Sequence, residues 1–275
     1  MDADVQLFSM GSWVVILAFA TSSIGILVGL VSARKARSAV TERQRLYWLL
    51  LSASTVGGVG VWLALLLAVA GFGISGSVVR HDLLTIAFSL AAALVSAFVA
   101  LVVSVPRGGE HSPGRLLAGG VLFGLGISAV FLSLMWSVRL QGTFTFEALF
   151  VVASTAVSLV VAFSFLWLVE VADNFLLRVC GSVVTSAAVL GVYFLGMASV
   201  DVTPDTAMPM PGGTELFSVL FVVFVVGMVV LTLPIVLALM DPDRVAAQLE
   251  READQWVAGR GVAGSSGSDE GMSVR

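Results

Sequence analysis

The chain has 275 residues, of which 58% are apolar and 12% charged, and its formal net charge is −4. A water-soluble domain of this size needs far more polar surface, so the composition excludes a soluble globular protein and predicts an all-α integral membrane protein. The acidic balance includes no basic stripe, which excludes nucleic acid as a partner.

The first apolar run, residues 12–32, is too long and continuous for the apolar region of a signal peptide. The residues before it include Asp2 and Asp4 where a signal peptide has Lys or Arg. We therefore expect a retained first helix. Gly25 and Gly29 form a GxxxG pair in it, which could pack onto the other helices or dimerise.

Further runs long enough to cross about 30 Å of hydrocarbon follow along the chain. They cover residues 47–71, 83–105, 116–137, 148–169, 179–198 and 217–240, and none contains Asp, Glu, Lys or Arg. The sequence thus predicts a membrane domain with seven transmembrane helices over residues 1–240, surrounded by the lipid bilayer.

The basic residues predict the orientation of these helices. Of the 14 Lys and Arg residues, all but Arg80 and Arg139 fall in the loops and the tail on one side of the predicted spans. Basic residues near span ends resist translocation, so the N-terminus is expected outside and the C-terminus in the cytoplasm. The preference for Arg over Lys is typical of a GC-rich bacterial genome, and we expect the bacterial cytoplasmic (inner) membrane.

After the first helix, the chain repeats one unit three times, over about residues 47–105, 116–169 and 179–240. Each copy has a glycine-rich helix, a loop, one carboxylate and a returning helix; the carboxylates are Asp82, Glu147 and Glu215. Such self-similarity indicates a copied supersecondary unit. Small residues let membrane helices approach closely, so we expect the glycine-rich helices at the centre and the returning helices outside.

The three carboxylates each open a returning helix. An acidic side chain there can cap free amides and is favoured by the helix dipole, and capping is the role we expect. The alternative is a ring of outer carboxylates that binds a cation or a cationic ligand.

Near the outer end of the glycine-rich helices the copies read GVGVWLALLLAV from Gly58, GLGISAVFLSLMW from Gly124 and TSAAVLGVYFLGMA from Thr185. With the seven spans and the repeats, these segments resemble the MHYT family of bacterial membrane sensor modules, over about residues 11–240. Copies in that family read approximately GMHYTGMA, whose His and Met suit copper. The resemblance implies a sensory or signalling function, and many members are fused to cytoplasmic signalling domains.

In this chain the family's His positions hold Leu65, Phe131 and Tyr193. The family's later Met survives as Met135 and Met197, and the last outer loop adds Met208 and Met210. Two thioethers hold Cu(I) only softly, so we expect no cofactor and assign Met135 and Met197 to packing and Met208 and Met210 to an ordinary connecting loop. Copper capture by these methionines is the alternative.

The sequence also predicts the environment of three other side chains. Tyr193 is expected to make a structural hydrogen bond between helices. His81 lies in an outer loop beside Asp82, where we expect a solvated side chain and, as the alternative, a pH sensor. The only cysteine, Cys180, has apolar neighbours, which predicts a buried and inert thiol.

After the membrane domain, residues 241–260 predict an amphipathic cytoplasmic helix, and residues 261–275 have a disordered composition. We expect a membrane sensor or signalling module without its own output domain, which signals to a cytoplasmic partner through the first loop and the tail. A membrane anchor or assembly partner is one alternative. A small transporter or channel is another, although the spans lack ionisable residues. The sequence has no catalytic set, so we expect no enzyme.

Overall fold

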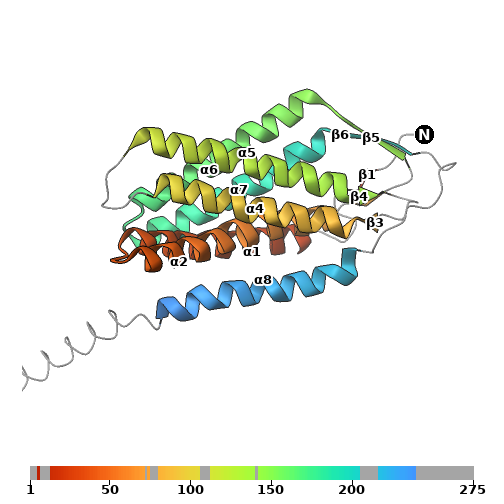
Figure 1. Cartoon of the computed structure of the whole chain (residues 1–275). Coiled ribbons are helices and arrows are strands. Elements are labelled where there is room, and N and C mark those ends of the chain that lie inside the picture. Colours follow the sequence, from red (N-terminus) through yellow and green to blue (C-terminus); the bar gives the residue numbers. More distant parts are fainter. Residues whose placement is uncertain are drawn as a thin grey trace, which may run out of the picture. The chain divides into compact units, whose positions relative to one another are not determined.

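The computed structural model describes residues 5–6, 13–71, 73–74, 80–105, 112–139, 142–204 and 216–239. Its helices are α1 (Trp13–Arg37), α2 (Glu42–Ala53), η1 (Ser54–Leu63), α3 (Ala64–Ala70), α4 (Leu83–Ser104), α5 (Pro113–Ser137), α6 (Ala148–Val171), α7 (Phe175–Ala198) and α8 (Leu216–Leu239) (Figure 1). The chain divides into two compact units, Met1–Thr232 and Leu233–Arg275. All contacts discussed below lie within the first unit.

These helices confirm the all-α prediction and follow the predicted spans in order. Because α2, η1 and α3 are continuous, they form one rod, Glu42–Ala70, which we name the second span. This rod and five further helices, α1 and α4 to α7, are long and apolar enough to cross a membrane. In α8 the structure describes a shorter apolar stretch, Leu220–Val236. The predicted tail helix, residues 241–260, lies outside the described residues.

Some helices begin earlier than their apolar runs. The second span begins at Glu42 rather than at residue 47, because Thr41 caps it: the Thr41 hydroxyl accepts a hydrogen bond from the Gln44 N–H at 3.2 Å. α5 and α7 likewise begin at Pro113 and Phe175. Neither Ser112 before α5 nor Asn174 before α7 makes a side-chain capping hydrogen bond, so only the start of the second span is explained by a cap.

The middle of the second span is a π-helix of 10 residues, η1. π-Helical turns are rare and occur often at functional sites. Two serine hydroxyls join this span to α1: Ser22 donates to the Gly60 carbonyl at 2.7 Å and Ser52 to the Gly29 carbonyl at 2.8 Å. The GxxxG pair of α1 therefore packs inside the bundle, and Gly25 lies directly against Gly60.

Only one glycine-rich helix is central. In its most apolar stretch the second span is 83% buried, compared with 44% for α5 and 33% for α7, and the returning helices α4 and α6 are also 33% buried. The prediction that all three glycine-rich helices form the centre was wrong. In α5 the glycines allow close contact with the adjacent helices instead: a Cβ at Gly124 would lie 2.8 Å from the Cα of Leu159 on α6.

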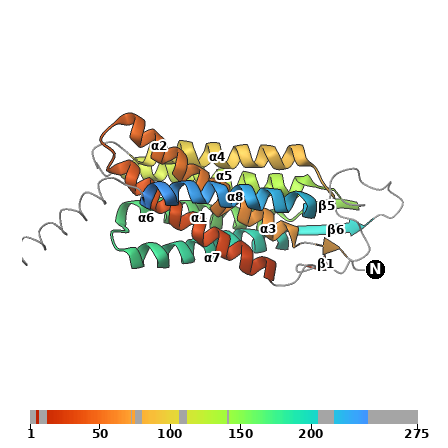
Figure 2. The same ribbon diagram turned by 90° about the horizontal axis from the view of Figure 1, so that it is seen from below.

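Helices that follow one another in the chain make the most extensive contacts. The most extensive contacts join α4 to α5, α6 to α7, and α5 to α6, while α1 packs on the second span and on α7. Within the described residues α8 makes only sparse contacts with the other helices, α7 included. The third predicted pair thus does not pack as α5 and α6 do. Figure 2 shows α4 and α5 running side by side.

Short antiparallel strands gather at one end of the helices, which we name the strand end (Figure 1). β1 (Val5–Gln6) pairs with β2 (Gly73–Ile74), β3 (Arg80–His81) with β4 (Val138–Arg139), and β5 (Gly142–Phe146) with β6 (Val200–Pro204). The last two pairs tie the start of α4 to the end of α5 and the start of α6 to the end of α7.

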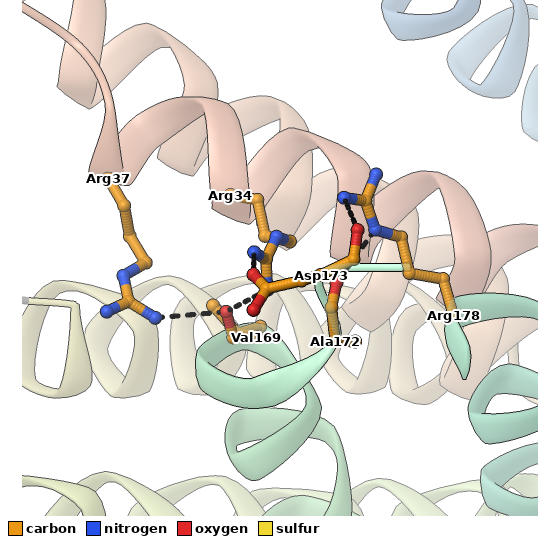
Figure 3. A network of polar contacts seen from close by, with 6 residues as sticks. All are labelled: Arg34, Arg37, Val169, Ala172, Asp173 and Arg178. Atoms are coloured by element: carbon orange, nitrogen blue, oxygen red, sulfur yellow. Dashed lines mark hydrogen bonds and ion pairs between the residues drawn. The ribbon is translucent and has the colours of Figure 1, made fainter. Parts of the chain in front are cut away.

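At the opposite end, which we name the arginine end, arginines bind the last carbonyls of α4 and α6. Arg45 donates to Val105 at 2.6 Å and Arg115 to Val103 at 3.1 Å. The α6 end receives hydrogen bonds from Arg34, Arg37 and Arg178 (Figure 3). Carbonyls at a helix C-terminus lack intrahelical partners and carry partial negative charge, so these contacts stabilise both helix ends.

Candidate functional site

The three motif positions all lie inside the bundle. Leu65 on α3, Phe131 on α5 and Tyr193 on α7 are each at most 2% exposed. The three helices contact one another. The second and third copies also interlock, because a Cβ at Gly196 would lie 2.2 Å from Cε1 of Phe131. Gly196 in the third copy therefore makes room for the motif side chain of the second.

The second and third copies end in the same way at the strand end. Ser137 and Ser199 each follow their motif position by six residues, and each hydroxyl donates to the carbonyl three residues earlier. The Ser137 carbonyl accepts the Asp82 N–H at 2.9 Å, and the Ser199 carbonyl accepts the Glu147 N–H at 2.8 Å. The residue that opens each returning helix is thus bound to the end of the next copy.

The carboxylates differ in what their side chains do. Asp82 caps α4, accepting the Leu84 N–H at 3.0 Å, and pairs with Arg139 at 3.2 Å. The Arg139 guanidinium and the Leu84 amide lower the pKa of Asp82. Glu147 occupies the cap position of α6, but its side chain makes no capping hydrogen bond, so the capping prediction was wrong there. Glu215 lies outside the described residues.

Two of the four candidate methionines, Met135 and Met197, lie within the described residues. Met135 and Met197 are both buried, on α5 and α7. Met208 and Met210 lie outside the described residues. Within the described part of the chain no group of three or more His, Cys, Asp or Glu side chains could hold a metal ion. Two thioethers are a poor donor set for any ion harder than Cu(I).

Two predictions about exposure were wrong. His81 is buried, at 5% exposure, rather than solvated, and neither ring nitrogen has a hydrogen-bond partner among the described residues. Burial lowers the pKa of His81 to about 4, so the ring stays neutral at mildly acidic pH. Cys180, by contrast, is exposed on α7 rather than buried.

Tyr193 also differs from its prediction. Its hydroxyl is buried and has no hydrogen-bond partner in the part of the chain that the structure describes. Its ring packs edge-on against Phe194, with centroids 5.3 Å apart. The expected hydrogen bond between helices was therefore wrong, and Tyr193 acts here as an aromatic packing residue.

We expect Tyr193→Phe to stabilise the protein. Removing a buried hydroxyl that lacks a partner removes its desolvation cost, which amounts to about 1 kcal/mol or more. Thermal unfolding of the purified protein in detergent measures the change. Tyr47→Phe, at a half-exposed position on α2, is the control and should be neutral. Destabilisation by Tyr193→Phe would instead reveal a bound group on the hydroxyl.

An apolar cavity of about 220 Å³ lies beside the π-helix. Residues of η1 form one wall, α4 a second, and α8 the third; they include Gly58, Val59, Trp62, Leu94, Val223 and Val226. Trp62 is held in place because its indole N–H donates to the Ser89 hydroxyl at 2.8 Å. The wall is therefore ordered and almost entirely apolar.

A second apolar cavity, of about 260 Å³, lies on the other flank of α8. Leu17 of α1 and Leu67 of α3 line it, together with Leu220, Phe221 and Phe224 of α8. Between the cavities α8 is seated on the second span through Gly227, where a Cβ would lie 2.5 Å from Cδ2 of Leu63. α8 therefore contacts the second span closely at Gly227, with a cavity on either side of this contact, and it is held less firmly than the other long helices.

The sequence analysis did not identify these cavities. The only available signals were the glycines Gly58 and Gly227, which do not reveal which helices they face. An apolar cavity of this kind can bind an apolar molecule, but it has no acids, bases or metal ligands with which to catalyse a reaction.

Comparison of the chain with protein-family models, curated proteins and solved structures finds no match.

Proposed function

We propose that this protein is a sensory or signalling module of the bacterial cytoplasmic membrane, with its N-terminus outside and its arginine end in the cytoplasm. Its input is an apolar molecule that enters from the bilayer between α8 and the π-helix. The observation that carries this proposal is the apolar cavity of about 220 Å³ walled by η1, α4 and α8. The resemblance of the three motif segments to the MHYT family supports the same class of function.

The output in this proposal is a change in the position of α8. A ligand that binds two conformations unequally shifts their populations by its difference in affinity. α8 is suited to a change of position because it makes few contacts with the other helices besides the close contact of Gly227 with Leu63. The chain continues from α8 into residues 240–275, which would pass the change to a cytoplasmic partner.

Binding of 1-aminoanthracene, a fluorescent apolar probe, tests the input. We expect saturable binding that Leu94→Trp weakens about tenfold or more, because the larger ring fills the cavity. Leu122→Trp, on an exposed face of α5, is the matched control and should leave the affinity unchanged. Equal affinities for both variants would contradict the cavity as the binding site.

Spin labels at Ile16→Cys and Val229→Cys, in a Cys180→Ala background, test the output. Both positions are exposed, so the labels disturb little packing. The proposal expects the distance distribution between α1 and α8 to change on probe binding. An unchanged distribution contradicts signalling through α8, and a stoichiometric membrane protein that co-purifies with the chain would favour the assembly-partner alternative.

A further inference from the structure

An open cavity of about 460 Å³ lies at the arginine end, between the last turns of α1 and α6. Arg34, Arg37, Ser38, Glu170 and Asp173 line it. Its volume falls in the range of roughly 300–1,000 Å³ that small-molecule sites occupy. The apolar runs of both helices end just before these residues, so the cavity lies at the depth of lipid headgroups when the helices span a bilayer.

Only two of the four charged side chains of this cavity form an ion pair with each other. Arg34 forms an ion pair with Asp173 (Figure 3). Arg37 donates one hydrogen bond, to the Val169 carbonyl at 3.1 Å, and its other guanidinium donors have no partner among the described residues. Glu170, partly exposed on the opposite wall, has no hydrogen bond or ion pair among the described residues. One guanidinium and one carboxylate are thus left without a charged partner.

We propose that this cavity binds the headgroup of phosphatidylethanolamine. The phosphate accepts hydrogen bonds from Arg37, since a guanidinium presents paired donors that match phosphate oxygens. The primary ammonium donates to the Glu170 carboxylate. The negative phosphate of the lipid thereby pairs with Arg37, and its positive ammonium pairs with Glu170.

The same charges discriminate between headgroups. Phosphatidylcholine has a quaternary ammonium without N–H donors, so it cannot hydrogen-bond to Glu170. Phosphatidylglycerol has no cation and leaves Glu170 facing a net negative lipid, which is unfavourable. Phosphatidylethanolamine is therefore the preferred occupant. This inference does not depend on the α8 cavity.

Native mass spectrometry of the full chain, purified from equal mixtures of phosphatidylethanolamine and phosphatidylcholine, tests the proposal. We expect retention of phosphatidylethanolamine to exceed that of phosphatidylcholine about tenfold, as a charge-assisted hydrogen bond provides. Glu170→Gln should bring the two lipids to near parity, and Arg37→Gln should lower retention of both. Arg43→Gln is the matched control, because Arg43 lies exposed on α2 at the same end and does not line the cavity.

A competition with soluble headgroups uses only the wild-type chain. Glycerophosphoethanolamine should displace the bound lipid more effectively than glycerophosphocholine or inorganic phosphate. Displacement by inorganic phosphate to the same extent would show a simple anion site and overturn the assignment. Parity of the two lipids on the wild-type chain, or an unchanged preference in Glu170→Gln, would also overturn it.

Discussion

Gly25→Ala should destabilise the protein by about 3 kcal/mol, at the upper end of the effects of overpacking. A Cβ at Gly25 would lie 2.6 Å from the backbone nitrogen and 2.8 Å from the Cα of Gly60. These are backbone atoms of the most buried span, so no side chain can rotate to relieve the overlap. α1 would have to move away from η1, which would also break the hydrogen bond from Ser22 to the Gly60 carbonyl. Thermal unfolding in detergent measures the loss.

Gly191→Ala is the matched control for this substitution. It adds the same methyl group in the middle of a long helix, but the nearest atom, Cγ1 of Val157, lies at an ordinary contact distance of 3.7 Å. Alanine favours a helix over glycine by up to about 1 kcal/mol, so this variant should be neutral or slightly stabilised. Similar losses in both variants would mean that α1 and the second span do not approach through Gly25.

Stability should fall as the pH decreases from about 6.5 to about 4, because of His81. In the unfolded chain the ring binds a proton below its ordinary pKa of 6.5, whereas burial lowers the pKa in the folded protein to about 4. The unfolded state therefore binds more protons in this window and is favoured as the pH falls. At about 1.4 kcal/mol per unit, the loss is roughly 3 kcal/mol and is complete below the folded pKa.

The measurement is the unfolding temperature as a function of pH for the wild-type chain and for His81→Leu. The variant should lose the dependence between these two pH values, since leucine does not titrate and suits an apolar site. His111→Gln, at the only other histidine, is the control and should keep the dependence. Asp82 does not interfere, because Arg139 holds the pKa of its carboxyl below the ordinary 3.8. A flat wild-type profile would show that His81 is solvated.

Several features followed from local physical chemistry and were predictable. Long apolar runs form helices in hydrocarbon because every backbone group must be satisfied within the segment, so the helices appear where the runs are. The Asp82 cap is a contact over two residues and needs no tertiary information. Glu147 shares with Asp82 the backbone contact to the next copy, yet its side chain makes no capping hydrogen bond.

The packing partners of individual glycines could not be predicted from the sequence. Gly25, Gly124 and Gly196 are alike in the sequence, yet one lies against a backbone, one against a leucine of α6 and one against an aromatic ring. The sequence therefore indicated close packing without indicating its partner. The burial of His81 and the missing partner of Tyr193 were not predictable for the same reason, because both depend on which helices surround them.

The order of the helices along the chain and their helical character follow from the apolar runs, because these are short-range effects. Which helix lies at the centre, where α8 leaves apolar cavities, and how Arg34, Arg37, Glu170 and Asp173 come together are settled only in three dimensions. α1 and α6 lie more than a hundred residues apart in the chain. Their contact depends on packing of the whole bundle, and no local pattern encodes it.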